Sequence, residues 1–429
     1  MFFQYPVKSG NVMMDMVLAL TRGHWPSVIG AWLHLTVSFM VWLLIGALSL
    51  ILAQDLHLSQ TDTALAVSLP LLSGALLRIV AGWSSDWYGA KPTGVLILAG
   101  ELAVVLWGWL GVHSYVELLL VAALLGLGGA SFAVTLPLAG RTYPAAHQGW
   151  VLGIVASGNV GTVMILFFAP RIAATGGWHD VFGWMVLPII LALAVFLLVV
   201  RDDRRSRRAE RDTHWWHNVA VMIRQPKAYW LCGLYAVTFG GFVGFCSIFP
   251  LFFHEQYHMD EIAAGSIAAL CGLVGSLIRP LGGYAADRIG GLRTLMLLLP
   301  IIVGIVAVLG EFTDVSVAVV LTVAVVGAMG IGNGVILQLA SEWFPKQMGL
   351  ASGIVGAAGG IGGFLLPLWL GTLKEVTGSY RTGLWVFAVA TGVAWGAVLL
   401  AERRASRIIN PMEAPSRFLF DSEGPKKQC

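Results

Sequence analysis

Long runs of apolar residues limit what this chain can fold into more than any other feature. Stretches such as 41–53, 95–110, 181–200 and 295–309 are nearly free of charge, and only 11% of the 429 residues are charged. In a soluble domain about 25% of the residues are usually charged. A bilayer core about 30 Å thick takes about 20 helical residues, and backbone groups in lipid must bond to one another. We therefore expect an all-α membrane protein.

The apolar runs predict twelve transmembrane helices. Their expected ranges are 29–53, 61–84, 93–112, 115–140, 148–170, 180–200, 229–253, 261–285, 293–310, 315–340, 348–371 and 381–400. The chain divides into an N-terminal segment (1–28), a six-helix bundle (29–200), a linker (201–228), a second six-helix bundle (229–400) and a tail (401–429). The first apolar patch contains Asp15 and lacks a small-residue cleavage site, so we expect no cleaved signal peptide.

Lys and Arg are distributed unevenly between the two sides of the predicted bundle. With the termini and the linker 201–228 in the cytoplasm, three of the 26 Lys and Arg lie outside: Arg171, Lys374 and Arg381. Arg78 and Arg279 lie within helices, and the other 21 are cytoplasmic. Cytoplasmic loops are enriched in these residues, which predicts this orientation. The basic linker could instead bind nucleic acid or lipid head groups, but we favour the topological role and expect no nucleic-acid partner.

The two predicted bundles are related by an internal repeat. A shift of 201 residues places Arg78 on Arg279, Asp86 on Asp287 and the stretch 126–129 on 327–330. A constant shift over this length indicates duplication, and so predicts bundles related by pseudo-twofold symmetry. Two parallel repeats suit alternating access, in which the halves rock about a site near the bilayer midplane.

Two glycine-bounded loops repeat with the same shift. They read GWSSDWYGAK at 82–91 and GYAADRIGGLR at 283–293. Both resemble the signature loop of the major facilitator superfamily, in the expected places after helices 2 and 8, although Trp87 stands where a basic residue is usual. The resemblance implies that fold, with Asp86, Asp287 and Arg288 as a conformational latch. A purely structural turn is the alternative.

Arg78 and Arg279 are predicted to lie deep in the membrane. Each precedes its loop aspartate by eight residues, which is about 12 Å along a helix. An arginine at the bilayer centre costs about 2.5–3.5 kcal/mol even on the lenient insertion scale, and neither helix offers a nearby carboxylate. A small planar anion between the two guanidinium groups would relieve their repulsion and accept paired hydrogen bonds. The sequence therefore predicts an anion site, rather than arginines that reach to the interface.

The predicted helices 148–170 and 348–371 are rich in glycine. Small residues at such spacing let helices approach closely, either as static packing or to permit sliding. The candidate gating and packing glycines are Gly153, Gly158, Gly161, Gly353, Gly359 and Gly362.

These two stretches, together with 38–42 and 234–245, resemble the nitrate/nitrite porter family of the major facilitator superfamily over about residues 32–395. The resemblance implies that Arg78 and Arg279 clamp the anion and that Asn159 hydrogen-bonds to it. It also implies an aromatic lining formed by Phe132, Tyr235, Phe239 and, on a weaker match, Phe39. Nitrate suits such a site because it is flat, monovalent and weakly hydrated.

The mode of energy coupling stays open between two alternatives. Uptake of an anion against an inside-negative potential costs about 2.3 kcal/mol per 100 mV, whereas nitrate/nitrite exchange moves no net charge. His34 and Glu101 are the candidate proton-coupling groups within helices, and a packing role is the alternative for each. We favour proton-linked nitrate uptake over exchange.

Two other functional classes fit the sequence less well. A membrane enzyme would need clustered polar residues, and the ten histidines show no metal-binding spacing, so we expect no enzyme, metal or cofactor. An anion sensor on a transporter fold would normally carry a signalling domain, for which the tail is too short. The family resemblance implies a bacterial inner membrane, and we expect a monomer.

Overall fold

The computed structural model describes residues 23–143, 145–201, 219–222, 224–344 and 348–409. Most of the predicted segment 1–28, of the linker 201–228 and of the tail 401–429 lies outside these residues.

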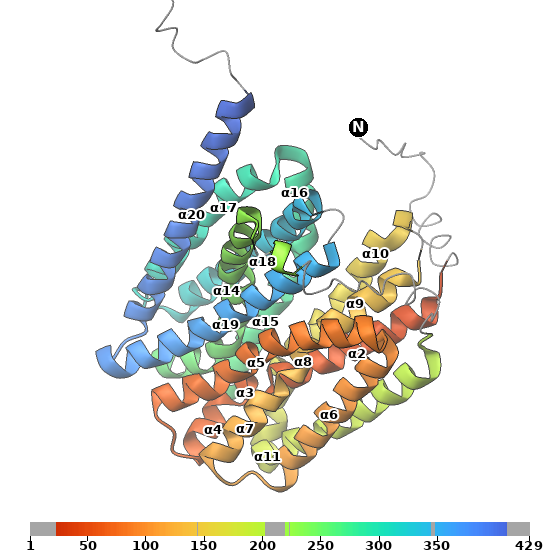
Figure 1. Ribbon diagram of the computed structural model, residues 1–429. Helices are drawn as coiled ribbons and strands as arrows, with labels where there is room; N and C mark the ends of the chain where they lie inside the picture. Colours follow the sequence, from red (N-terminus) through yellow and green to blue (C-terminus); the bar gives the residue numbers. More distant parts are fainter. Residues whose placement is uncertain (1–22, 144, 202–218, 223, 345–347, 410–429) are drawn as a thin grey trace, which may run out of the picture.

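The described chain is built from helices (Figure 1). In the first half these are α2 (Trp25–Trp42), α3 (Leu44–Ala47), α4 (Ser49–Asp55), α5 (Gln60–Trp87), α6 (Ala90–Leu110), α7 (Tyr115–Leu125), α8 (Leu127–Ala130), α9 (Phe132–Arg141), α10 (Ala145–Ala156), the 3-10 turn η1 (Ser157–Asn159) and α11 (Val160–Val199). In the second half they are α14 (Pro226–Tyr257), α15 (Glu261–Leu277), α16 (Arg279–Ile289), α17 (Gly291–Leu309), α18 (Val315–Trp343), α19 (Met348–Thr377) and α20 (Arg381–Ile409).

Ten helices in the described part of the chain are long and apolar enough to cross a membrane. One of them, Val151–Val199, contains two spans, because the chain reverses at Gly177, where φ is 81°. Gly158 packs on Leu35 and Val200 packs on Gly30, so both ends of this segment lie against α2. The helices α2, α3 and α4 form a further span in three pieces. With these two adjustments the described helices account for twelve spans.

Several predicted helix boundaries are wrong in detail. The predicted helix 29–53 begins at Trp25 and is broken at Leu43 and Leu48, and the predicted helix 261–285 is broken at Ile278. The break in the first helix accompanies a close approach, because a Cβ on Gly46 would lie 3.0 Å from the Ser247 carbonyl oxygen of α14. The residue pattern within one helix does not show which distant segment packs against that helix. These breaks were therefore not predicted from the sequence.

The loops of the repeat are tighter than predicted. The helices α5 and α6 are separated by Tyr88 and Gly89, and α16 and α17 by Gly290 alone. The φ angles of Gly89 and Gly290 are 111° and 94°, a backbone conformation that strongly favours glycine. These two glycines therefore make such short turns feasible.

The two halves meet through two equivalent pairs of helices. The helix α19 of the second half lies beside α5 of the first half in Figure 1, and α11 of the first half contacts α15 of the second. Pro170 packs on Gly265, and the residues 201 positions away from them, Gly371 and Ala64, also pack together. This matched pair of contacts is what pseudo-twofold symmetry between the repeats requires.

Candidate functional site

The Arg78 side chain is buried in α5 and held by the backbone of its own half. Its Nε and Nη2 atoms donate to the Gly129 carbonyl oxygen at 3.2 and 2.9 Å. Its guanidinium carbon lies 5.2 Å from the centre of the Phe132 ring and 5.9 Å from that of Trp42. One edge of the guanidinium group is thus occupied by the Gly129 carbonyl, and two aromatic rings lie close to the group.

The equivalent side chain, Arg279, has a different environment. Its guanidinium carbon lies 4.9 Å from the Phe242 ring centre and 5.6 Å from that of Phe239. Its Nε and Nη2 atoms are buried and have no hydrogen-bond partner among the described residues. Gly330 is the counterpart of Gly129 in the second half, but Arg279 does not donate to the Gly330 carbonyl oxygen as Arg78 donates to that of Gly129. Two adjacent donors of a guanidinium fork are therefore left to bind a planar oxyanion.

The predicted aromatic residues form one stack in each half. The Tyr235 and Phe239 rings are parallel to within 1°, with centres 4.9 Å apart, and the Phe39 and Phe132 rings lie 6.5 Å apart at 20°. Phe132 and Phe239 each flank one of the two arginines. The two stacks thus place an aromatic face beside each arginine.

Glycines of α19 lie directly against these groups. A Cβ on Gly356 would be 2.7 Å from the Arg78 Nη1 atom, and one on Gly359 would be 2.7 Å from the Tyr235 ring and 2.8 Å from the Phe239 ring. Sequence reasoning selected Gly359 but missed Gly356, Trp42 and Phe242. Gly356 lies three residues before Gly359, on the same face of the helix, and this spacing is the signal that could have found it.

Asn159 is engaged at the interface between the halves. Its Nδ2 atom donates to the Ser276 Oγ atom at 2.6 Å. A side-chain amide has two such hydrogens, so one donor remains. The repeat places Gly360 at the position of Asn159, and Gly360 packs on Ala75, the counterpart of Ser276. A polar contact on one side of the pseudo-twofold axis is thus matched by an apolar contact on the other.

The other candidate glycines fall into two groups. Gly158 and Gly161 pack on α2, and Gly362 packs on α14, each within its own half. A Cβ on Gly161 would lie 1.9 Å from the Thr36 carbonyl oxygen, which shows very close packing. Gly153 and Gly353 have no atoms near the Cβ position. Close helix packing therefore explains why glycine is present at Gly158, Gly161 and Gly362. Gly153 and Gly353 make no close contact in the described conformation.

The predicted latch residues are paired unequally. Asp86 bonds to Arg141 at 2.9 Å, between α5 and α9 of one half. The repeat places Glu342 where Arg141 would be, so Asp287 has no equivalent basic partner at that position. The Arg288 guanidinium lies 4.9 Å from the Tyr284 ring centre. The latch role of these residues stays a prediction.

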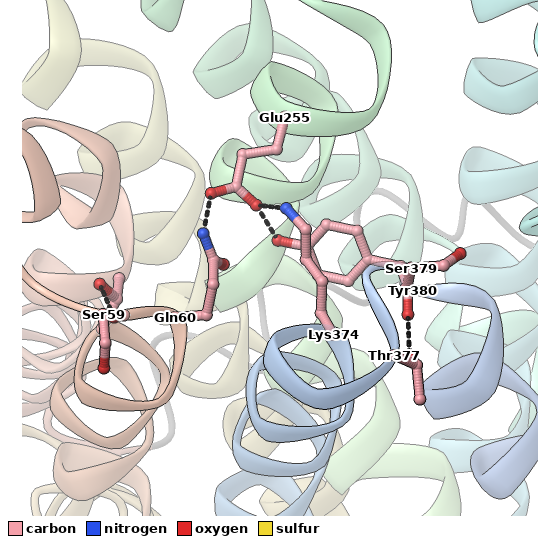
Figure 2. Close-up of polar contacts among 8 residues, drawn as sticks. Ser59, Gln60, Glu255, Lys374, Thr377, Ser379 and Tyr380 are labelled. Carbon is pink, nitrogen blue, oxygen red and sulfur yellow. Dashed lines mark hydrogen bonds and ion pairs between the residues drawn. The ribbon is translucent and has the colours of Figure 1, made fainter.

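A polar cluster that sequence reasoning missed joins the halves at the end opposite the linker (Figure 2). The Glu255 carboxylate on α14 accepts from Gln60 of the first half at 2.7 Å and from the Tyr380 hydroxyl at 2.5 Å, and it forms an ion pair with Lys374. Beside this cluster, the Glu375 carboxylate accepts from the Thr61 backbone N–H at 2.8 Å.

Contacts between the halves extend from this cluster as far as the arginines. On the linker side, by contrast, Gly153, Gly283 and Gly353 have no atoms near their Cβ positions. We name the two ends the far side, with Glu255, and the linker side, with Gly89 and Gly290. The described conformation is closed on the far side.

Comparison with known proteins gives a class for this fold and site. The chain matches the Major Facilitator Superfamily over residues 31–340 and 231–423. Its fold is similar to that of a D-xylose–proton symporter, with a TM-score of 0.66 and 16% identity, over 89% of this chain and 97% of the symporter. The chain therefore has the fold of the Major Facilitator Superfamily and belongs to it.

Sequence relatives narrow this class. A nitrite extrusion protein of Bacillus subtilis is 34% identical over 82% of this chain and 88% of its own length. A probable nitrate/nitrite transporter of Mycobacterium tuberculosis is 33% identical over 85% of this chain and 93% of its own. A probable nitrate/nitrite antiporter of Thermus thermophilus is 27% identical over 85% of this chain and 88% of its own length. The chain belongs to the nitrate/nitrite porter family of the major facilitator superfamily.

Proposed function

We propose that this protein carries nitrate and nitrite across the cytoplasmic membrane by alternating access, as a monomer with its termini and linker in the cytoplasm. The observation that carries the proposal is the pair of buried donors on Arg279 that have no partner among the described residues. Together with the Tyr235–Phe239 stack and with Arg78, they offer a flat monovalent oxyanion paired hydrogen bonds and aromatic faces. The protein performs no covalent chemistry on its substrate.

We favour proton-linked uptake as the mode of transport. Exchange of nitrate for nitrite is the second candidate, because the relative from Thermus thermophilus is described as an antiporter. An anion sensor on the same fold is a third candidate, which would bind nitrate without moving it.

Uptake of labelled nitrate into proteoliposomes tests the proposal. With an acidic exterior and no internal nitrite, we expect accumulation of nitrate that collapses when a protonophore is added. Uptake that depends strictly on internal nitrite would favour exchange, and binding without uptake would favour a sensor. A protein that neither binds nor moves nitrate or nitrite would contradict the proposal.

The Glu255 cluster supports an assignment of the described conformation as closed to the outside. We expect Glu255→Ala to lower nitrate uptake by about tenfold, because it removes the acceptor of Gln60 and leaves Lys374 without its counter-ion. Initial rates in proteoliposomes measure this effect.

Glu311→Ala is the matched control for Glu255→Ala. Glu311 pairs with Arg381 at 2.6 Å, and both residues belong to the second half at the same far side. An ion pair within one half does not hold the two halves together, so uptake should stay within twofold of the parent. Equal loss of uptake in the two variants would mean that Glu255 does not act between the halves.

A further inference from the structure

A second polar group is buried in the first half, away from the two arginines. It consists of His34 and Ser38 on α2 and Glu101 on α6, and each side chain is 0% exposed. Sequence reasoning named His34 and Glu101 separately, and it missed the serine between them. Ser38 lies one turn after His34, so their side chains share a face of α2.

The hydrogen bonds in this group have a definite direction. The His34 Nε2 atom lies 3.1 Å from the Gly94 carbonyl oxygen, which can only accept, so Nε2 carries the hydrogen. In the neutral ring the Nδ1 atom is then an acceptor, and the Ser38 hydroxyl, 3.2 Å away, donates to it. The lone pairs of the Ser38 oxygen are left to accept a hydrogen bond.

Glu101 is the natural donor to that oxygen. Both of its carboxyl oxygens are buried without a hydrogen-bond partner among the described residues, and α6, which carries Glu101, packs against α2, which carries Ser38. An ionised carboxylate in this place would be uncompensated. A protonated carboxyl group has an O–H that can donate, and a small side-chain movement that brings it to the Ser38 oxygen would complete a chain from Glu101 through Ser38 to His34.

No other charged group is placed to compensate Glu101 within the described part of the chain. On the elements packed against α6, His34 is the titratable group that shares this chain of polar contacts. Most other charged or titratable groups on these elements have partners elsewhere: Arg78 on Gly129, Arg141 on Asp86, Glu117 on the 113–114 backbone, Tyr115 on the Asp62 carbonyl, Arg171 on Ser266 and His179 on Val112. Asp180 lies beside Gly176, near the turn of α11 at Gly177. Asp62 and Lys91 bond near the ends of their helices.

The group also adjoins the support of the predicted anion site. A Cβ on Gly128 of α8 would lie 2.2 Å from the Ser38 carbonyl oxygen, so α2 and α8 touch at this residue. The next residue of α8, Gly129, is the acceptor of Arg78. A shift of α2 at Ser38 would therefore be transmitted through α8 to the guanidinium group.

We infer that Glu101, Ser38 and His34 form the proton-binding site through which this transporter couples anion movement to a proton gradient. The inference rests on the proposed function. A proton from water forms an O–H bond at the Glu101 carboxylate, which then donates to Ser38, while Ser38 donates to His34. When the proton leaves, the Ser38 hydrogen turns to the carboxylate, and the bond between Ser38 and His34 is lost. The position of α2 against α8, and with it Arg78, then differs between the two protonation states.

Two transport assays on the same proteoliposomes test this inference. Glu101→Gln imitates the protonated carboxyl group, so it should lower nitrate accumulation driven by a pH gradient by at least tenfold. Nitrate–nitrate exchange, which needs no release of the proton, should fall by less than threefold. Glu117→Gln is the control, because Glu117 caps α7 at the surface of the same half, and both activities should stay near the parent values.

Ser38→Ala provides a second variant in case Glu101→Gln fails to fold. It removes the link between the carboxyl group and His34, so driven accumulation should fall at least fivefold and its pH dependence should shift, with exchange retained. Driven accumulation with the parent pH dependence in either folded variant would overturn the inference. A parent protein that moves nitrate only in exchange for nitrite would overturn it while leaving the transport function intact, and a parent that moves neither anion would overturn both.

Discussion

Arg279→Lys is expected to lower nitrate uptake by at least about 100-fold while the protein still inserts in the membrane. The guanidinium edge formed by Nε and Nη2 offers two parallel donors, and a lysine cannot reproduce that planar pair. Each hydrogen bond to a charged group contributes about 1.5–3 kcal/mol, and about 1.4 kcal/mol corresponds to a factor of ten. Initial uptake rates and nitrate titration of the purified protein measure the loss.

Arg78→Lys should abolish uptake as well, because it also removes both bonds to the Gly129 carbonyl oxygen. Arg381→Lys is the matched control. Arg381 pairs with Glu311 within the second half at the far side, so this variant should keep uptake within twofold of the parent. Substantial nitrate uptake by either site variant would refute an anion clamp built from two arginines.

The fold was predictable because its main determinants are local. A span needs only an uninterrupted apolar run, and the positions of Arg78 and Arg279 follow from their distance to the loop aspartates. The tight turns at Gly89 and Gly290 were also marked in the sequence by glycines. These features depend on residues within about 20 positions of one another, so one sequence was enough to locate them.

The contacts that join the halves were not predictable in this way. Glu255 and Lys374 are separated by more than a hundred residues and looked like ordinary charges near helix ends. Gly356 and Gly360 lie in the glycine-rich predicted helix 348–371, but only the packing shows that Gly356 faces Arg78 and Gly360 faces Ala75. Which face of a helix meets the other half depends on its rotation, and apolar residues surround a membrane helix on every side.

Departures from the repeat mark the residues with individual roles. Arg78 is held by a backbone carbonyl and Arg279 is not, and Asn159 stands where the other half has Gly360. Asp86 has Arg141, and the repeat replaces that arginine with Glu342. A symmetric scaffold allows the halves to rock, while an anion that must be held and then released needs different chemistry on the two sides. The asymmetric positions are therefore the ones to change experimentally.

Gly371→Val should abolish nitrate uptake by preventing closure of the far side. A Cβ on Gly371 would lie 2.2 Å from the Ala64 Cβ and 2.9 Å from the Gln60 carbonyl oxygen, and neither a packed methyl group nor backbone can withdraw without separating α5 from α19. The anion site is untouched, so nitrate binding by the purified protein should remain.

Ser68→Cys reports the opening of the far side, because Ser68 is buried on the face of α5 that also carries Ala64. This thiol should react with an impermeant maleimide faster in the Gly371→Val background.

Gly353→Val is the control on the same helix. It distinguishes loss of far-side closure from any general destabilisation of α19 by a valine. Gly353 lies on the linker side and has no atoms near its Cβ position, so the added side chain meets open space in the described conformation. We expect that variant to insert normally, to bind nitrate and to leave the Ser68→Cys thiol as unreactive as in the parent. Because the halves must approach on the linker side at the other end of the transport cycle, uptake by Gly353→Val should fall too, with the closed far side retained. Equal maleimide reactivity in the two valine variants would contradict the view that Gly371 sets the closure of the far side, since the two changes differ only in which end of the interface they occupy.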